Sequence, residues 1–427
     1  MKRFIALVLL CATAWLPASA RDESGDRRQE TFDIVWRAVK DKHFDPTFGG
    51  VDWDKVREQY APRVAKVKSD DELYNLLQQM LGELGQSHFN IIPPEAIVEN
   101  GAEPRTGTTG LSVRYVDKQL LVTHVAENSP AARAGLRQGF LIRQVDQTTD
   151  EQIVQRFAKS KESPAMKELM IGRSALAHID GKPGTSVRLV YEDGSNKRQE
   201  VTVTREKRKG EMSEAMGNFP PQYMEFESRR LEGGIGYIRF NIFVMPLLDR
   251  IRSAIREMND APGIIIDLRG NPGGIGAMSS GIVGVLETRQ ISLGTMKMRS
   301  GQMNFLVFPQ KNAYTGPVAV LIDSGSASTS EIFASGIQEI GRAVVIGERS
   351  AGAALPSVFQ KLPTGAIFQY AIGDFKSPRG TLIEGRGVTP DIEVKLSRAA
   401  LLKGRDPQLD AAIEQVKKKA AEMRRAS

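Results

Sequence analysis

A serine-rich turn lies between an apolar strand pattern and a helical pattern in the last third of the sequence. Residues 318–322 (VAVLI) have the composition of a buried strand, and residues 323–330 (DSGSASTS) lead directly into the helical pattern of 330–341. A serine at a strand-to-helix turn is exposed on a rigid support, where helix N–H groups can stabilise an oxyanion. Serines that precede a helix also serve as N-caps. The turn alone therefore predicts either a nucleophile or a helix cap.

A glycine-rich loop follows a second apolar strand pattern. Residues 263–268 (GIIIDL) precede residues 270–276 (GNPGGIG), so the loop lies at the carboxyl end of a predicted strand, where sites form in α/β proteins. The loop is a weak candidate for dinucleotide binding, because Pro272 and the glycine spacing depart from G-x-G-x-x-G. The sequence contains no H-E-x-x-H motif and no cysteine cluster. We therefore expect no cofactor and no metal.

Three motifs make the sequence resemble the tricorn and carboxyl-terminal processing protease family. They are SASTSEIFASGIQEIGRAVVIG at 326–347, DLRGNPGG at 267–274 and EGRGVTPDIEV at 384–394. With the helical and β-rich regions described below, the resemblance covers nearly the whole chain after residue 20. It implies a serine peptidase whose nucleophile is the middle serine of the three, Ser328.

The general base has to be assigned within that family. Many members pair the serine with a lysine 25 residues later, and Ala353 occupies that position here. A serine without a base is a poor nucleophile. Two alternatives therefore stay open beside a histidine base: a displaced lysine, such as Lys361 or Lys376, and a non-catalytic peptide-binding protein that keeps the fold.

The tricorn-like branch of the family implies a histidine base. In that branch a serine–histidine pair follows the helical N-terminal region and a glutamate lies near the end of the core, and these positions hold Ser87, His88 and Glu384. In a Ser-His-Glu arrangement the imidazole takes the proton of the serine, the carboxylate orients the imidazole, and N–H donors hold the oxyanion. A histidine base predicts activity that falls as the pH drops through roughly 6.5. The expected oxyanion donors are the backbone of Gly273 or Gly274 together with that of Thr329.

Each of these assignments has a structural alternative. His88 could be a satisfied polar residue at a domain boundary, and Glu384 could simply pair with a nearby arginine. Ser87 could bind the glutamate or the oxyanion region, or could only shape its loop. Glu339 takes the place of an acidic residue that supports the lysine in the dyad enzymes, so without that lysine we expect it on the helix surface.

The region from 106 to 208 predicts short β-strands. Within it, residues 129–139 (SPAARAGLRQG) resemble the PDZ-domain signature. In that fold the C-terminus of a peptide adds a strand to the sheet edge while backbone N–H groups hold its carboxylate. The resemblance therefore implies that polypeptide substrates bind by their C-terminal tail, and an unrelated small β domain is the alternative. Residues 152–178 look helical and predict an insertion that partly covers the groove. The carboxylate-binding loop would consist of Gly110, Leu111, Ser112 and Val113.

The elements that must position these residues suggest several units, because 427 residues are too many for one ordinary core. We expect a signal peptide at 1–20, a helical cap at 28–95, a PDZ-like domain with a helical insertion at 105–208, an α/β core at 225–400 and a C-terminal helix at 401–427. In the core, strand patterns (235–240, 263–268, 318–322, 343–346, 367–370) alternate with helical patterns (247–258, 277–286, 330–341). The fold class is multidomain α+β, and the family resemblance implies a ClpP/crotonase-like protease core.

The first twenty residues have the features of a secretory signal. The segment has a basic start (KR at 2–3), an apolar run to residue 16 and the sequence ASA at 18–20. These features predict export to the periplasm, with cleavage after Ala20 and no stable membrane span thereafter. A retained signal anchor is the alternative. Cys11, the only cysteine, lies in this segment, so the mature fold cannot depend on disulfides. The net charge of +7 is small and scattered, which argues against nucleic-acid binding. The sequence does not indicate an oligomeric state.

Overall fold

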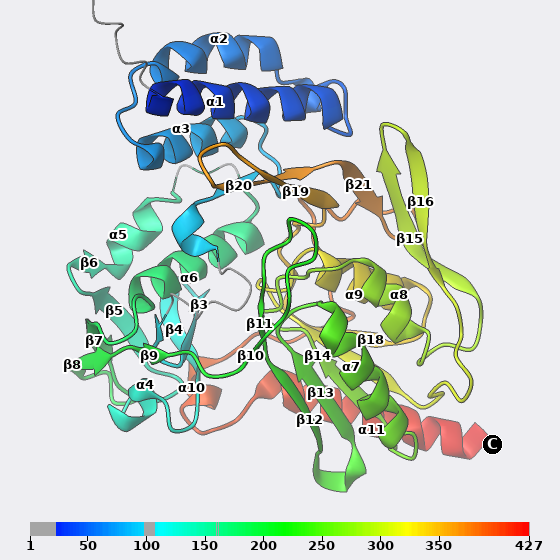
Figure 1. The fold of residues 1–427 in the computed structure, drawn as a ribbon. Helices are drawn as coiled ribbons and strands as arrows, with labels where there is room; N and C mark the ends of the chain where they lie inside the picture. Colours follow the sequence, from blue (N-terminus) through cyan, green and yellow to red (C-terminus); the bar gives the residue numbers. More distant parts are fainter. Residues whose placement is uncertain (1–22, 98–106, 159, 161, 427) are drawn as a thin grey trace, which may run out of the picture.

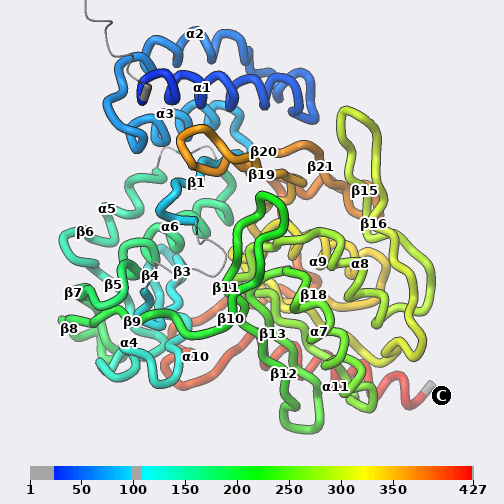
Figure 2. The backbone as a smooth tube through the Cα atoms, in the orientation of Figure 1, coloured from blue at the N-terminus to red at the C-terminus, as the bar shows by residue number. Residues whose placement is uncertain are grey.

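The structure is a computed structural model that describes residues 23–97, 107–158, 160 and 162–426. The segment interpreted as a signal peptide, residues 1–20, lies outside these ranges. Within them, no helix combines the length and the apolar character needed to cross a bilayer. The chain forms a helical layer at the top of the view, a β-rich domain at the left and a larger α/β core at the right (Figures 1 and 2).

Three helices form the N-terminal layer. At the starts of the second and third, the side chains of Asp52 and Ser69 each accept a backbone N–H three residues ahead, which satisfies a donor that the helix itself leaves free. The apolar faces bury Trp53 and Leu77 in one cluster that also contains Phe368 of the core. The layer is therefore packed directly on the core. The helices are α1 (Glu23–Lys42), α2 (Trp53–Val64) and α3 (Asp70–Gly82), with short 3-10 turns at Phe48–Gly50 and Pro94–Ala96.

A short strand joins this layer to the core. Strand β1 (Asn90–Ile92) pairs antiparallel with β20 (Ile367–Ala371), whose other neighbour is β19 (Ser357–Lys361). The Ser87-His88 turn directly precedes β1, so this pairing carries the turn to the core. The strand predicted at 367–370 is present, but it belongs to this small antiparallel sheet and not to the parallel sheet of the core.

The β-rich domain is an antiparallel sheet in the order β3-β4-β5-β7-β8, which leaves β3 at an edge. The helical pattern at 152–178 is divided into two helices, because Pro164 starts the second one and proline cannot continue a helix from the residue before it. The second helix, α6, lies along the edge strand β3. The elements are β2 (Gly107–Thr108), β3 (Leu111–Val116), β4 (Gln119–Val125), α4 (Pro130–Arg133), β5 (Leu141–Val145), β6 (Thr148–Thr149), α5 (Asp150–Gln155), α6 (Pro164–Ile179), β7 (Ser186–Glu192), β8 (Arg198–Thr204) and β9 (Glu206–Lys207).

The core is built on a six-stranded sheet in the order β12-β13-β14-β17-β18-β22, parallel except for β12. In β14, Ile264 and Ile266 face the cluster under α7, α8 and α9, whereas Ile265 faces the cluster under α11. A strand covered on both faces explains the continuous apolar run in the sequence. The elements are η3 (Glu232–Gly234), β12 (Phe226–Arg230), β13 (Gly236–Phe240), α7 (Met245–Glu257), β14 (Ile264–Asp267), α8 (Ala277–Val283), β17 (Val318–Ile322), α9 (Thr329–Glu339), β18 (Val344–Gly347), β22 (Ile392–Glu393), α10 (Arg398–Leu401) and α11 (Pro407–Ala426).

Two further sheets border the core. The hairpin of β15 and β16 projects at the upper right of Figure 1, and β15 also pairs with a third strand, in the order β16-β15-β21. A second, two-stranded sheet connects the β-rich domain to the core. None of these strands was predicted. They are β10 (Glu211–Met212), β11 (Tyr223–Met224), β15 (Ile291–Met298), β16 (Gly301–Val307) and β21 (Gly373–Lys376).

Candidate active site

Ser328 occupies a sharp turn between β17 and α9. Its backbone has φ 55° and ψ −118°, a region that a non-glycine residue adopts only where the surroundings impose it. Two acceptors hold its N–H: the carbonyl oxygen of Ala353 at 2.7 Å and Oε2 of Glu331 at 3.1 Å. The capping serines Ser69 and Ser129 instead have the extended backbone typical of N-caps. The backbone of Ser328 is thus that of a strained strand-to-helix turn, which favours the nucleophile interpretation over the cap.

The glycine-rich loop lies against this turn. A Cβ atom on Gly273 would stand 2.7 Å from both Cβ of Ser328 and N of Thr329, so only glycine allows the approach. The N–H of Gly273 donates to Oδ1 of Asn271 at 2.9 Å and is already engaged. Among the described residues, nothing accepts a hydrogen bond from the N–H of Gly274 or of Thr329. Of the two glycines proposed as oxyanion donors, Gly274 is therefore the one whose N–H is available.

Glu384, Ser87 and His88 form a connected relay. The Glu384 carboxylate accepts the N–H of Ser87 on Oε1 at 2.8 Å and the hydroxyl of Ser87 on Oε2 at 2.9 Å. The Ser87 hydroxyl is in turn 2.7 Å from Nδ1 of His88. The carboxylate therefore contacts the serine, and the serine contacts the imidazole.

The relay determines which nitrogen of His88 carries the proton. The single hydroxyl proton of Ser87 is donated to Glu384, because a carboxylate can only accept. The oxygen of Ser87 must then accept a proton from Nδ1–H of His88. The other ring nitrogen, Nε2, consequently keeps its lone pair and is the atom able to act as a base.

Two adjacent residues connect the relay to Ser328. Ala353 accepts the N–H of Ser328 on its carbonyl, and the next N–H, that of Ala354, donates to Oε2 of Glu384 at 2.9 Å. The nucleophile and the acidic end of the relay are therefore attached to neighbouring peptide units. Within the part of the chain that the structure describes, no hydrogen bond joins the Ser328 hydroxyl to the ring of His88. Such a bond commonly tightens only when substrate is bound.

The ionisation of the site is governed by burial. Burial, and then the positive charge of Arg173, lower the pKa of His88 to about 4. The imidazole is consequently neutral at physiological pH, as a base must be. Burial raises the pKa of Glu384, while the three hydrogen bonds from Ser87 and Ala354 act in the opposite direction.

The lysine positions have no connection to this relay. Ala353 lies in a buried apolar cluster with Ala327 and Ala351, so no amine occupies the dyad position. Lys361 and Lys376 are exposed at the ends of β19 and β21. Neither forms a hydrogen bond or an ion pair with any of the site residues that the structure describes.

Helix α6 brings the β-rich domain to the site, a feature that the sequence did not reveal. Met166 and Leu169 pack against the alanine cluster beside Ser328. The Ser163 hydroxyl lies 3.5 Å from the carbonyl oxygen of Ala351. The only sequence signal was the helical pattern itself, which does not indicate what its exposed face covers.

The expected carboxylate-binding loop lies at the start of β3, on the other side of α6. Gly110 has φ 81°, and Leu111 and Val113 are buried. Helix α6 closes the groove here, since a Cβ atom on Gly172 would stand 3.4 Å from the carbonyl oxygen of Val113. Neighbouring strands need about 4.8 Å between their backbones. The structure therefore leaves no room for an added strand in that groove.

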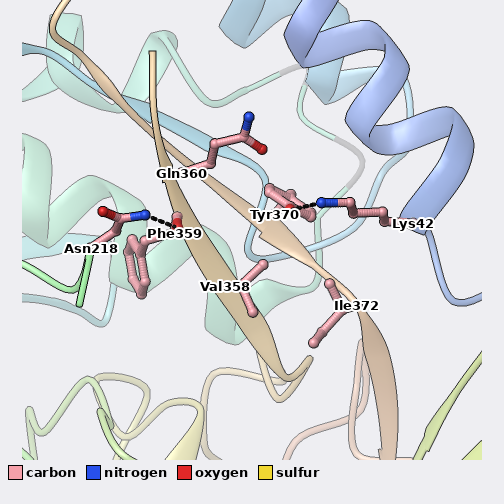
Figure 3. A pocket seen from close by; sticks show the side chains of 7 residues that line it. All are labelled: Lys42, Asn218, Val358, Phe359, Gln360, Tyr370 and Ile372. Atoms are coloured by element: carbon pink, nitrogen blue, oxygen red, sulfur yellow. Dashed lines mark hydrogen bonds between the residues drawn. The ribbon is translucent and has the colours of Figure 1, made fainter. Parts of the chain in front are cut away.

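A separate surface pocket of about 470 Å³ lies on the β19–β20 hairpin (Figure 3). Lys42 from α1 reaches across it to the hydroxyl of Tyr370 at 3.2 Å, and Asn218 donates to the carbonyl oxygen of Phe359 at 3.0 Å. None of the residues proposed for catalysis lines this pocket. The lining residues are Lys42, Asn218, Val358, Phe359, Gln360, Tyr370 and Ile372.

Solved structures with a similar fold include a processing protease. The photosystem II D1 C-terminal processing protease superposes with a TM-score of 0.59 at 23% identity, covering 90% of this chain and 99% of that one. Mature CPAF bound to lactacystin superposes with a TM-score of 0.63 at 14% identity, covering 93% and 98%. At these identities the similarity establishes the fold.

Sequence comparison identifies the family. The chain is 25% identical to the carboxyl-terminal-processing protease of Synechocystis over 391 residues, covering 89% of this chain and 84% of that protein. It is 24% identical to the carboxy-terminal processing protease CtpB of Bacillus subtilis, covering 90% and 71%. The profile of peptidase family S41 matches residues 234–394, and that of the tricorn protease C1 domain matches residues 25–82. The chain therefore contains a peptidase family S41 domain and a tricorn protease C1 domain, and it is a serine-type peptidase.

Proposed function

We propose that this peptidase cleaves polypeptides through an acyl-enzyme, with Ser328 as nucleophile and His88 as general base. The observation that carries the proposal is the Ser87 bridge, which binds His88 on one side and Glu384 on the other. It leaves Nε2 of His88 unprotonated, as the reaction requires.

The proposed reaction uses one proton carrier. Nε2 of His88 takes the hydroxyl proton as Oγ of Ser328 attacks the peptide carbonyl, and the N–H groups of Gly274 and Thr329 stabilise the oxyanion. The imidazolium then gives that proton to the departing amine, which leaves an acyl-Ser328 ester. A water, deprotonated by the same nitrogen, hydrolyses the ester, and the imidazolium returns that proton to Oγ of Ser328 as the acid product leaves. Throughout, Ser87 and Glu384 hold Nδ1–H and offset the positive charge.

We further propose that the substrates are polypeptides bound by their C-terminal tail, and that the protein is exported. The first point is supported by the names of the relatives, which describe carboxyl-terminal processing; binding of a tail at the edge strand β3 would require α6 to move away from it. The second is supported by the signal-like first twenty residues.

The test combines an active-serine reagent with a loosely folded protein substrate. Purified wild type should react with a fluorophosphonate at Ser328 and degrade casein, and Ser328→Ala should do neither. His88→Ala should lower both rates by about 1,000-fold or more, since triad members act as a unit. His124→Ala, which alters an exposed histidine on β4, is the matched control and should behave as wild type.

Two outcomes would decide against the proposal. A wild-type protein with neither adduct nor turnover would be a binding protein that keeps the fold. Full activity in His88→Ala, especially with activity still rising at alkaline pH, would point to a lysine base such as Lys361 or Lys376.

A further inference from the structure

A fully buried carboxylate lies directly behind the nucleophile. Glu331 is in the first turn of α9, three residues after Ser328, and its exposed fraction is 0%. Four donors converge on its two oxygens. These are the Ser350 hydroxyl at 2.5 Å and the Gly352 N–H at 2.7 Å on Oε1, and the Ala353 N–H at 2.8 Å and the Ser328 N–H at 3.1 Å on Oε2.

This carboxylate has no positive partner. No lysine, arginine or histidine forms an ion pair with Glu331 in the part of the chain that the structure describes. Burying an unpaired ionisable group opposes folding, and hydrogen bonds only offset that cost. An alanine or an apolar residue would avoid the cost of burying a charge, but it would leave these buried donors without their acceptor, so the role of the glutamate lies in the groups that it holds together.

The donors belong to the two chain segments that carry the catalytic groups. The Ser328 N–H is the backbone of the nucleophile itself. The loop 350–353 is attached to the segment that carries Glu384, because the Val388 N–H donates to Oγ of Ser350 at 2.6 Å and the Gly385 N–H donates to the carbonyl oxygen of Gly352 at 2.8 Å. One carboxylate therefore contacts both halves of the site.

We propose that Glu331 is a positioning residue that holds the strained Ser328 turn and the Glu384 segment in register with each other. It touches neither substrate nor a reacting atom. Glu331 affects the reaction by fixing the direction of the Ser328 side chain and the position of Glu384. The inference therefore rests on the proposed roles of those two residues.

The arrangement of the four donors requires a carboxylate at position 331. In Glu331→Gln the shape is preserved, but one oxygen becomes an NH₂ group that can only donate. That group would face two of the four N–H or O–H donors, whichever way the amide turns. Depending on how the amide turns, the N–H of Gly352 or that of Ala353 would be buried without an acceptor, which costs about 1–3 kcal/mol and is enough to shift the loop, whereas the Ser328 N–H would keep the carbonyl oxygen of Ala353.

The experiment measures the rate of fluorophosphonate labelling at Ser328, together with kcat and KM on casein, for wild type, Glu331→Gln and Ser350→Ala. Glu339→Gln is the matched control: it lies two turns further along α9 and accepts hydrogen bonds from Ser377 and Arg379, away from the site. Circular dichroism and thermal melting establish that each variant is folded.

We expect Glu331→Gln to lower the labelling rate and kcat by about 10- to 100-fold while KM changes less than about threefold, because about 1.4 kcal/mol in the barrier is tenfold in rate. Ser350→Ala removes one donor and should lower both rates by about 3- to 10-fold. Glu339→Gln should match wild type.

The outcomes separate this inference from the proposed function. A folded Glu331→Gln protein with wild-type rates overturns the inference, and so does a change confined to KM. If Glu331→Gln does not fold, Ser350→Ala decides, and wild-type rates in that variant overturn the inference. Failure of the proposed function has a different signature: wild type itself, like Ser328→Ala, would then not be labelled.

Discussion

At the scale of single residues, a hydroxyl group stands where a carboxylate would be expected beside the imidazole of His88, the proposed base. Ser87 passes the effect of Glu384 to His88 without bringing the charge into contact with the ring. The ring is therefore neutral chiefly because its half-buried position removes much of its solvation, and the nearby Arg173 adds to this effect. A site of this kind should keep its base unprotonated to lower pH than an exposed histidine would.

The pH dependence of Ser328 labelling should show two steps. As the pH falls, Glu331 takes a proton first, because burial, with a contribution from the charge of Glu384, raises its pKa to about 7. A protonated oxygen accepts fewer hydrogen bonds, so the turn loosens. His88 becomes protonated near pH 4. The active forms are ionised Glu331 and neutral His88, so both steps lower the rate as the pH decreases.

The measurement is the second-order labelling rate between pH 3.5 and 9, compared in wild type and Glu331→Gln. Glu331→Gln has no titratable group at position 331, so its labelling rate should show only the step that is due to His88. Above that step, the rate should be constant and lower than that of wild type. A single step near 6.5 in both proteins would contradict this interpretation and would restore the value that the sequence suggested for an unperturbed histidine.

The sequence predicted Ser328, Ser87, His88 and Glu384 as site residues through motif order, since motifs preserve residue type and spacing. It did not predict Glu331, because nothing in the string SASTSE indicates that the glutamate points inward to meet a loop twenty residues away. It also could not choose between the two glycines. That choice depends on which N–H is already bonded, and only the folded loop reveals this.

At the scale of elements, helix α6 packs against two parts of the structure, the sheet of the β-rich domain and the alanine cluster of the core. Along one side it packs on strand β3, and the residue at the contact is Gly172. Along another side it presents Met166, Leu169 and Arg173 at spacings of three and four residues, which is one face of a helix. That face contacts the alanine cluster beside Ser328 and influences the pKa of His88. A strand entering between β3 and α6 would therefore have to move the helix that covers the site.

The double variant Met166→Ala/Leu169→Ala should make the nucleophile more accessible. Both side chains are partly buried against the alanine cluster, and their truncation removes about 1–2 kcal/mol of apolar contact, which favours open positions of α6 by about 5- to 30-fold. We expect a bulky fluorophosphonate to label Ser328 faster, and a small one to label it nearly as before. Leu176→Ala, on the side of α6 that faces the sheet, is the control. An equal or slower rate with the bulky reagent would contradict the covering role.

The helical pattern at 152–178 was predicted as an insertion over the peptide groove. The pattern could not show that Pro164 divides it, nor that the helix also reaches the core. Periodicity identifies an apolar face, and a helix that packs on two partners shows two such faces merged into one broad stripe. The strands β15, β16 and β19 were missed because their half-exposed, polar sequences give no alternation strong enough to stand out.

At the scale of the whole molecule, Arg114 of β3 connects the β-rich domain to the nucleophile loop. Its guanidinium is 3.2 Å from Asp323 and 2.9 Å from Glu348, and it donates to Oγ of Ser324 at 3.2 Å. Asp323 also accepts the N–H of Gly270, at the start of the glycine-rich loop. The alternation of strands and helices in the core was predictable from local patterns. The connection through Arg114 was not predictable, because Arg114 lies more than two hundred residues from Asp323 and Glu348 in the sequence. None of these residues stands in a distinctive motif that would indicate the contact.

Removing this guanidinium should affect both stability and reactivity. The side chains of Arg114 and Asp323 are only 16% and 3% exposed, so Arg114→Ala leaves a buried carboxylate without its cation and should lower the free energy of unfolding by about 3 kcal/mol. Arg405→Ala breaks an exposed pair with Asp410 and should change it by less than about 1 kcal/mol. Urea unfolding measures both values.

Because Asp323 begins the turn that carries Ser328, the labelling rate of Arg114→Ala should fall as well, even under conditions where the protein remains folded. A stable variant with unchanged labelling would mean that the two domains are joined mainly by the apolar contacts of α6, and that the ionic link is incidental.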